Sequence, residues 1–574
     1  MSVQLPIETV RAIEALGEIV AGARAAGLES ETLDFKREDS SEGETARVLL
    51  EAAICFANAR GGVIVLGIDD RLTGTAAFLG AAIPTDVVRE RIYSLSRPNI
   101  VVTAREHEQE GKRLILIDVP QGMEMHSDTK GRSSRRVGRA CEPLTIAQAA
   151  ALQDDRRRID WSDQPSDLTT DDLAPDAVEA ARVMLRRYDD ERRSLAEAPV
   201  ADLLRELGVI RDGELLRAGE VLFCQRQGTT PILYTHRTSP GGEVRSSYRE
   251  SAPGLTAYRE VLRRIQDNSD VTDVTLPDGQ QVSLLDFPLV AVREALSNAL
   301  LHRDHRQPEP ILVDHSASIL AFVSPGPLVE GVTSENILHV PSKPRNALLS
   351  RVARTLGIAE EMSRGIDRMY REMIRLGKRP PEILNAPPFN VRVELIGGAP
   401  NQVVARFVSS LPTDAQDDVD VMIVLFQLLA QPTLSGVQIA PILQRTPAAT
   451  EMVLRRLADP PLELIAPSDR KGGRVWQLTA PVATALRAAL GYRTVTQDEI
   501  DRKIIEHVTA NGTIDSKTLQ IFFDLDVNAA SYRLRALRGA GVLAKLGDQE
   551  RGPGIRYGPG PSFPGKKQRR NAPS

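Results

Sequence analysis

The chain has 574 residues, of which 42% are hydrophobic and 26% charged, a balance typical of soluble globular proteins. This length is enough for about three to five domains of roughly 100–200 residues each. The net charge of −5 excludes a protein whose whole surface attracts nucleic acid, so any such binding needs local basic patches.

Cysteine usage and apolar runs predict the compartment. Cys55, Cys141 and Cys224 lie far apart, which fits neither a disulfide framework nor a zinc site and favours a reducing compartment. The first residues lack a basic stretch followed by an apolar core, so we expect no signal peptide. The most apolar stretch, 48–68, is interrupted by charged residues and glycines, so we expect no membrane span. A cytoplasmic protein without membrane association is therefore predicted.

Carboxylates flank two predicted strands near the start of the chain. After a predicted N-terminal helix over 1–26, the segment 33–36 is expected to form a short strand and the apolar run 63–68 a buried one. Side chains at the ends of buried strands are held rigidly, and rigid carboxylates share a cation. The candidate catalytic residues and ligands of Mg²⁺ or Mn²⁺ are Glu29, Asp34 and Asp69, with Lys36 beside them.

The same stretch contains a recurrent pattern: Glu29, then Asp34-Phe-Lys, then Phe56-Ala-Asn, Gly61-Gly and Gly67-Ile-Asp-Asp. With this pattern, residues 27–153 resemble the Schlafen-type AlbA-like domain of bacterial proteins. The resemblance implies nucleic-acid binding, and in nucleolytic members of that family three carboxylates cut RNA with a divalent metal. Glu29, Asp34 and Asp69 match those three positions in spacing, with Asp70 as an alternative third acid.

A basic cluster follows the predicted strand 113–119. Arginine suits phosphate because its planar guanidinium donates hydrogen bonds in pairs. A solvated loop is the alternative interpretation, but related domains end with an Arg-Val-Gly strand that 136–138 matches. The candidate nucleic-acid contacts in this cluster are Arg132, Arg135, Arg136 and Arg139.

Two polar stretches are predicted to be linkers. Residues 154–175 are charged and polar, and a helix is expected to begin at Pro175, so 154–199 is interpreted as a linker and a helix. Residues 398–416 are interpreted as a strand end followed by a second linker.

The predicted helix within 286–304 has two different faces. Apolar residues from Leu289 to Leu300 recur at helical spacing and form one face. Glu294, Asn298 and His302 recur every four residues and share another. On a half-buried helix such a polar stripe holds a hydrated magnesium ion and nucleotide phosphates, because Asn supplies a neutral oxygen and Glu orients water. A stripe that simply faces solvent is the alternative.

Three further segments bear on this stripe: EALSNALLHRD, ILAFVSPGPL and RNALLSRVARTLGIAEEMSRGIDRM. With them, residues 200–398 resemble a divergent branch of the GHKL-type ATPases, the gyrase and histidine-kinase superfamily. The resemblance implies an α/β sandwich that binds ATP. Asp-x-Gly-x-Gly and the Walker-type phosphate loop are both absent from the sequence, so turnover and a helicase motor of the Walker type are not predicted. The implied ATP-site residues are Glu294 as the base, Asn298 as the magnesium ligand, and His302, Gly326 and Gly365 around them.

Two similar units follow, at 417–490 and 500–560, each with three predicted helices and a two-stranded wing. Both resemble winged helix-turn-helix modules, in which the third helix enters the DNA major groove. A role as protein–protein adaptors is the alternative. The tail 561–574 is basic and rich in Pro and Gly, so disorder is predicted. The candidate DNA contacts are Arg455, Arg456, Arg533, Arg535 and Arg538.

The predicted fold class is α+β and multidomain, and three functions compete. The first is a nucleotide-responsive nucleic-acid-binding protein, a DNA-binding transcriptional regulator. The second is a metal-dependent ribonuclease in antiphage defence, acting on tRNA, other RNA or single-stranded DNA and gated by ATP. The third is an assembly adaptor with a degenerate ATP site. We favour the first, with ATP and Mg²⁺ or Mn²⁺ as cofactors, DNA or RNA as partner, and a homo-oligomeric state; enzymatic activity is left open.

Overall fold

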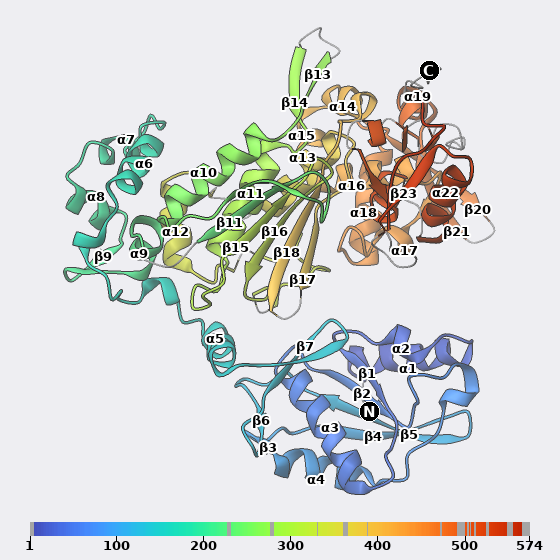
Figure 1. The fold of residues 1–574 in the computed structure, drawn as a ribbon. Helices are drawn as coiled ribbons and strands as arrows, with labels where there is room; N and C mark the ends of the chain where they lie inside the picture. The colour runs from blue at the N-terminus through green and yellow to red at the C-terminus, as the bar shows by residue number, and fades with distance from the viewer. Residues whose placement is uncertain are drawn as a thin grey trace, which may run out of the picture.

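The computed structural model describes residues 5–564 except 227–230, 276–280, 330, 342, 360–364, 387–388, 471–472, 491–499, 502–503, 506, 510–511, 524–526 and 548–554. It is an α+β fold with several open sheets, and a smaller N-terminal body lies below a larger one in Figure 1. Most of the predicted disordered tail, 565–574, lies outside the described residues.

The N-terminal body is a four-stranded sheet with helices on both faces. The strand order is β1-β2-β5-β4, with β1 parallel to β2 and the other pairs antiparallel. The predicted helix over 1–26 is too long, because the first helix ends at Val20 and Gly22 takes a left-handed φ of 109°. The elements are α1 (Ile7–Val20), α2 (Ala25–Leu28), β1 (Leu33–Lys36), α3 (Glu42–Ala57), β2 (Gly62–Leu66), η1 (Gly74–Ala77), α4 (Thr85–Leu95), β3 (Ser96–Arg97), β4 (Thr103–Gln109), β5 (Lys112–Val119), β6 (Ser127–Asp128), β7 (Ser134–Val137) and β8 (Ala140–Pro143).

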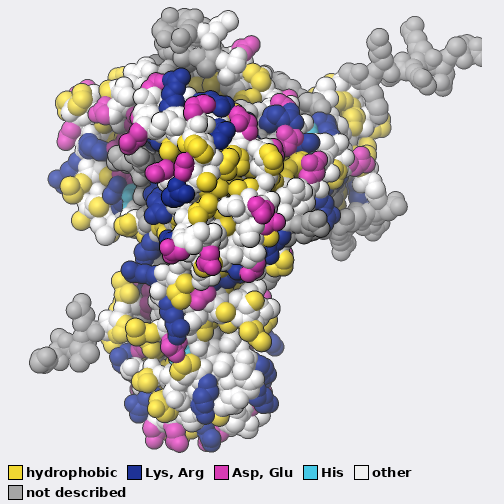
Figure 2. Space-filling view, turned by 90° about the vertical axis from the view of Figure 1, so that its left-hand side faces the viewer, with side chains coloured by type: hydrophobic (Ala, Val, Ile, Leu, Met, Phe, Trp, Pro, Cys, Tyr) yellow, Lys and Arg dark blue, Asp and Glu magenta, His cyan; other side chains and the backbone are white. Residues whose placement is uncertain are grey.

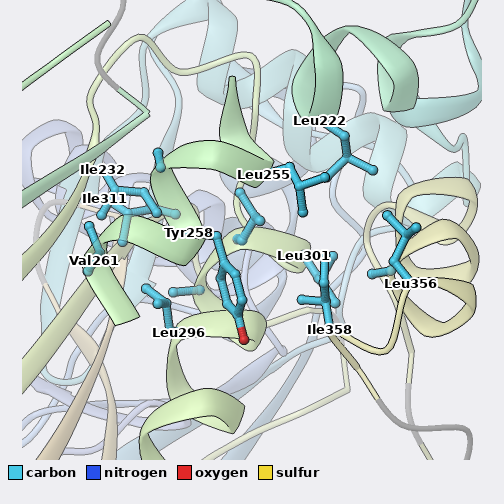
Figure 3. Packing of buried hydrophobic residues seen from close by; sticks show 14 of the residues in the cluster. Leu222, Ile232, Leu255, Tyr258, Val261, Leu296, Leu301, Ile311, Leu356 and Ile358 are labelled. Carbon is cyan, nitrogen blue, oxygen red and sulfur yellow. The ribbon is translucent and has the colours of Figure 1, made fainter. Parts of the chain in front are cut away.

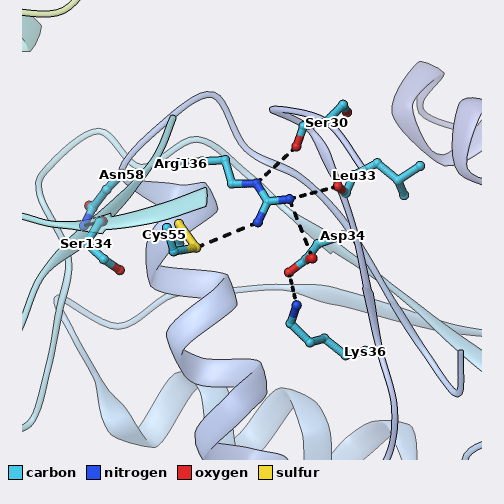
Figure 4. The surroundings of a disulfide bond; sticks show 9 residues. Ser30, Leu33, Asp34, Lys36, Cys55, Asn58, Ser134 and Arg136 are labelled. Carbon is cyan, nitrogen blue, oxygen red and sulfur yellow. Dashed lines mark hydrogen bonds and ion pairs between the residues drawn. A yellow bond between two sulfur atoms is a disulfide. The ribbon is translucent and has the colours of Figure 1, made fainter. Parts of the chain in front are cut away.

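Strand alternation decides which way the acidic side chain of β1 points. Leu33 and Phe35 pack in the cluster that includes α1, on one face of the sheet. Successive side chains of a strand point to opposite faces, so Asp34 and Lys36 point toward the side covered by α3. The sheet therefore presents a buried carboxylate to the space between β1, α3 and β7 (Figure 4).

A disulfide joins Cys55 of α3 to Cys141 of β8, with a Cα–Cα distance of 5.8 Å. The prediction that the cysteines form no disulfide was therefore wrong. The two residues are 86 positions apart in sequence, and they meet because the β7–β8 hairpin packs on α3. Cysteine spacing therefore no longer supports the prediction of a reducing compartment.

The stretch predicted as a linker is instead fixed in place. Leu348 and Leu349 at the start of the helix 347–355 donate their backbone N–H groups to the side chains of Asp160 and Ser162, over 2.7 and 3.1 Å. Side chains from another segment thus cap this helix, which has no cap of its own. The elements are α5 (Ile146–Arg157), η2 (Trp161–Asp163), η3 (Thr170–Asp172), α6 (Pro175–Leu185), α7 (Arg192–Leu195), α8 (Val200–Glu206), β9 (Ile210–Arg211), β10 (Glu214–Leu215) and α9 (Arg217–Phe223).

The larger body is built on a six-stranded sheet of order β12-β11-β15-β16-β18-β17, in which β11 and β15 are parallel and the other pairs antiparallel. One hydrophobic core, of which Figure 3 shows a part, includes residues from Ala177 to Leu395. Helix α6 contributes to this core and so belongs to the larger body. The elements are β11 (Ile232–Arg237), β12 (Val244–Tyr248), α10 (Gly254–Asp267), β13 (Val271–Thr275), β14 (Gln281–Leu285), α11 (Leu289–Leu301), β15 (Ile311–His315), β16 (Ile319–Pro325), α12 (Ala347–Thr355), α13 (Gly365–Arg375), β17 (Glu382–Ala386) and β18 (Asn390–Ile396).

The C-terminal region begins with a helix where a linker was predicted. Asn401 caps this helix by accepting from the N–H groups of Val403 and Val404, and Val408 packs in the core of the region. The region's two sheets have orders β19-β21-β20 and β22-β24-β23. The elements are α14 (Gln402–Ser409), α15 (Thr413–Gln416), α16 (Val419–Ala430), β19 (Leu434–Ser435), α17 (Gly436–Ile439), α18 (Pro447–Ala458), β20 (Ile465–Arg470), β21 (Gly473–Leu478), α19 (Ala480–Ala485), η4 (Arg487–Ala489), β22 (Ile514–Asp515), α21 (Ser516–Phe523), α22 (Val527–Gly539), β23 (Leu543–Leu546) and β24 (Arg556–Pro559).

Candidate functional site

Two of the three predicted carboxylates lie together in the N-terminal body. Asp34 is 1% exposed, and its carboxylate lies 2.7 Å from Lys36 Nζ and 3.6 Å from Arg136 Nη2. Burial, and then the neighbouring Asp34 carboxylate, raise the pKa of Glu29 to about 7. Glu29 Oε1 and both Asp34 oxygens are shielded from solvent. Such oxygens fit a cation, although Lys36 and Arg136 already offset part of the charge.

Asp69 is used differently. Its Oδ1 accepts the N–H of Arg71 over 2.9 Å, which closes the turn after β2. Among the described residues, no group of three or more His, Cys, Asp or Glu side chains is placed to hold a metal ion. The structure therefore brings Glu29 and Asp34 together, while a metal role for all three carboxylates stays a prediction.

The predicted basic cluster is divided by burial. Arg136 is 5% exposed, and it donates to the carbonyls of Ser30 and Leu33 over 3.1 and 3.2 Å (Figure 4). It holds β7 against β1, so its prediction as a nucleic-acid contact was wrong. Arg132 and Arg139 remain exposed, paired with Asp128 and with the carbonyl of Ala26. The Nη1 atom of Arg135 is buried.

We expect Glu29→Gln to stabilise the protein above neutral pH. A carboxyl whose folded pKa is raised to about 7 adds stability below its unfolded pKa, near 4.5, and loses it as pH rises through 7. Because Glu29 is only partly buried, we discount the shift to a gain of about 1 kcal/mol at pH 8 and none near pH 4.5. Urea unfolding at the two pH values measures this. Glu14→Gln, on the exposed side of α1, is the control, and a gain that does not depend on pH contradicts the prediction.

A second site lies in the larger body, where a cavity of about 270 Å³ opens between α11, α13 and the sheet. Glu294, Asn298 and His302, the whole predicted polar stripe, line it. Gly326 after β16 and Gly365 at the start of α13 line it too. The stripe therefore faces a cavity and not open solvent. Helical periodicity alone predicted which side chains share this wall.

Glu294 is held by α13. Its Oε1 accepts from Arg368 Nη1 over 2.9 Å. A Cβ at Gly365 would crowd the end of the Glu294 side chain, so a larger residue there would require the Glu294 carboxylate to move. His302 is kept neutral, because burial and then the charge of Arg345 lower its pKa to about 4. A neutral imidazole offers one donor and one acceptor at the cavity wall.

Sequence reasoning missed three basic residues here. Lys343 and Arg354 line the cavity. Arg345 lies behind its wall, is 7% exposed, and donates to the carbonyls of His302 and Pro327, each over 2.7 Å. The signal was the recurrence of basic residues through 343–354, which the sequence places after a Pro-rich turn.

Helix α5 connects this cavity to the N-terminal body. Asp155 of α5 accepts from Arg345 over 3.1 Å, and Asp154 accepts from Arg306 over 2.8 Å. On its other side α5 uses Arg156, which donates to the carbonyls of Glu124 and Ala57. Figure 1 shows α5 between the two bodies. A change in the cavity wall thus has a short, hydrogen-bonded route to the N-terminal sheet.

The predicted DNA-contacting arginines are mostly engaged within their own modules. Arg455 pairs with Glu451 over 3.0 Å, Arg456 pairs with Asp418, and Arg533 pairs with Asp501 over 2.6 Å. Arg535 donates to the carbonyl of Ser531, and Arg538 is exposed on α22. Exposed ion pairs are weak, so this pairing leaves a phosphate role open for the exposed members.

Family models match two segments of the chain. Residues 29–145 match the model described as “Schlafen, AlbA_2”, and residues 309–395 match “Putative ATP-dependent DNA helicase recG C-terminal”. The chain therefore carries a Schlafen-type AlbA_2 domain followed by an ATPase-like domain. The second match spans β15 to β18 and begins after α11, so the roles of Glu294 and Asn298 rest on the cavity geometry.

A solved structure resembles most of the chain. The DIP2311 protein from Corynebacterium diphtheriae is 28% identical, and the alignment covers 84% of this chain and 99% of that one with a TM-score of 0.51. No curated protein matches the chain. Of the helices in the described parts of the chain, none is both long enough and apolar enough to cross a bilayer.

Proposed function

We propose that this protein binds nucleic acid in a nucleotide-dependent manner and acts as a DNA-binding transcriptional regulator. One observation carries the proposal. The cavity of the ATPase-like domain is joined to the AlbA_2 domain through Arg345, Asp155 and the rest of α5. A ligand that moves the cavity wall thereby also moves the AlbA_2 domain, which is the proposed nucleic-acid-binding domain.

The cavity residues fit a nucleotide with magnesium. Its wall offers a neutral oxygen ligand on Asn298 and cationic side chains on Lys343 and Arg354 for phosphates. Bound Mg-ATP supplies concentrated negative charge at this wall. Glu294 is the candidate for orienting water, but Arg368 holds its carboxylate in this structure. The arrangement supports binding more strongly than turnover.

The C-terminal modules support DNA as the partner. In the first, the order is helix α16, strand β19, helices α17 and α18, then strands β20 and β21 joined in one sheet. This order supports the interpretation as a winged helix, a module in which the helix before the wing enters the major groove. Arg455 on α18 and Arg538 on α22 are exposed on the corresponding helices.

A metal-dependent ribonuclease is the second candidate. The observation that favours it is the pair Glu29 and Asp34, whose solvent-shielded carboxylate oxygens lie side by side. Two such carboxylates fit a divalent cation that activates water against a phosphodiester. The position of Asp69 in a turn and the charge of Lys36 beside Asp34 weigh against it.

One experiment separates the two functions. We expect duplex DNA to bind without cleavage, with affinity falling roughly 100-fold between about 50 and 200 mM salt if four phosphates are contacted. Fluorescence anisotropy with and without ATP measures binding. Incubation of tRNA and single-stranded DNA with Mg²⁺ or Mn²⁺ measures cleavage. Metal-dependent cleavage that disappears in both Glu29→Ala and Asp69→Ala would replace the regulator with the nuclease.

A further inference from the structure

A second, smaller cavity lies between the two bodies. Glu31, Arg60, Gln121 and Arg135 line it from the AlbA_2 domain, and the opposite wall comes from the ATPase-like domain around Leu328. Figure 2 shows Lys and Arg side chains gathered at the narrow waist between the bodies. The cavity measures about 30 Å³. A single water needs roughly 10–15 Å³, so this space admits a small oxyanion but not a nucleoside.

Arg135 is the unusual group of this cavity. Its Nη1 is shielded from solvent and has no hydrogen-bond partner in the part of the chain that the structure describes. Burial, then the nearby charges of Arg156 and Arg345, lower the pKa of Arg135 to about 10. A buried guanidinium normally has a carboxylate or phosphate partner, because leaving the charge uncompensated costs several kcal/mol.

The carboxylates near Arg135 are already engaged by other arginines. Glu31 pairs with Arg60 over 3.5 Å, and Asp155 pairs with Arg345 over 3.1 Å. An adjoining space of about 10 Å³, lined by Arg135, Asp155 and Arg156, continues the same positively charged pocket. The junction therefore holds more cationic than anionic groups, and Arg135 lines the space between them.

We propose that this interdomain cavity binds a phosphoryl group, with the guanidinium of Arg135 as its main ligand. The fork of donors on arginine matches phosphate oxygens, and a dianion satisfies the excess positive charge. Gln121 and Arg60 complete the wall on the same domain, while Leu328 closes it from the other. A phosphoryl group held here bridges the two domains.

The site is distinct from the nucleotide cavity yet shares a wall with it. Leu328 and Val329 line both, whereas Asn298 lines only the larger one and Arg135 only the smaller. Binding of phosphate at Arg135 therefore depends on the position of the shared wall, which a nucleotide in the larger cavity also touches. The phosphoryl group itself comes either from free phosphate and nucleotides or from the phosphorylated end of a nucleic acid.

The test is inorganic phosphate on the full chain, compared with chloride at equal ionic strength. We expect phosphate to raise the melting temperature of the wild type and to bind in calorimetry, and Arg135→Met to weaken that binding at least tenfold. In chloride alone, Arg135→Met should melt no lower than the wild type, because it removes a guanidinium whose buried Nη1 has no hydrogen-bond partner among the described residues. Arg47→Met, an exposed arginine paired with two glutamates on α3, is the matched control and should respond like the wild type.

Further measurements distinguish the phosphate site from the nucleotide cavity, and free phosphate from a nucleic-acid phosphate as the ligand. Phosphate should still bind Asn298→Ala, so failure of the nucleotide site leaves this proposal standing. A 5′-phosphorylated oligonucleotide that binds more tightly than its 5′-hydroxyl form, in the wild type but not in Arg135→Met, assigns the group to nucleic acid. Binding of phosphate alone assigns it to free phosphate. No response in the wild type, an equal response in Arg135→Met, or a lower melting temperature of that variant in chloride overturns the proposal.

Discussion

Replacing Cys141 with serine should lower the free energy of unfolding of the N-terminal domain by about 4–5 kcal/mol, which is what the chain-entropy model gives for a closed loop of this length. The disulfide to Cys55 closes a loop with a sequence separation of 86 residues. The loss should be local, because the bond ties the β7–β8 hairpin to the helix α3 of the same domain. Urea titration of the full chain, followed by a probe in the N-terminal domain, measures it, since several domains do not unfold as one.

Cys224→Ser is the matched control. Cys224 is a buried free cysteine in the larger body, and burial raises its thiol pKa to about 12, so it stays protonated and unreactive. This variant should leave the N-terminal transition in place. Reducing agent should shift the wild type to the behaviour of Cys141→Ser, and thiol titration of the oxidised wild type unfolded in urea should find one free thiol. An N-terminal transition that is identical with and without reducing agent contradicts the prediction.

Loss of the disulfide should also change the surroundings of the carboxylates Glu29 and Asp34. The hairpin carries Arg136, which reaches across to the carbonyls of Ser30 and Leu33 and lies 3.6 Å from Asp34. If the hairpin detaches, Asp34 keeps Lys36 but loses the guanidinium. The disulfide therefore also maintains the electrostatic environment in which Glu29 and Asp34 lie side by side.

What the sequence predicted well was local. The four-residue recurrence of Glu294, Asn298 and His302 follows from helical geometry, so their common wall needed no knowledge of the fold. The apolar run after Gly61 predicted a buried strand, and β2 lies in the middle of its sheet. Both patterns lie within a single helix or strand, where the spacing of residues in the sequence determines their spacing in the structure.

What the sequence failed to predict depends on contacts between distant segments. The run of arginines from 132 to 139 gave no sign that Arg136 is buried while Arg132 is exposed, since hairpin packing on α3 decides this. The polar stretch after 154 was interpreted as a linker, yet Asp155 and Asp160 bond to distant residues of the larger body. Polar composition indicates solvent only when no distant partner is available.

Asn298→Ala should weaken ATP binding in the presence of Mg²⁺ roughly 100-fold, which corresponds to about 2.7 kcal/mol and is within the range for a lost hydrogen bond to a charged group. Asn298 lies on the cavity wall formed by α11, one turn after Glu294. Alanine removes the neutral oxygen that would complete the magnesium shell, and no neighbouring side chain of the helix can replace it at the same position. Calorimetry with Mg-ATP, repeated with EDTA, measures the effect, and the gap between variant and wild type should shrink without the metal.

Asn268→Ala is the control for this variant. Asn268 belongs to the same body and donates to the carbonyl of Arg264 over 2.8 Å, but it does not line the cavity. It should bind ATP like the wild type. Equal ATP affinity in wild type and Asn298→Ala excludes the cavity as the nucleotide site. If the variant loses ATP but keeps its DNA affinity, while ATP changes the DNA affinity of the wild type alone, then nucleotide occupancy of the cavity is coupled to the nucleic-acid-binding parts of the chain.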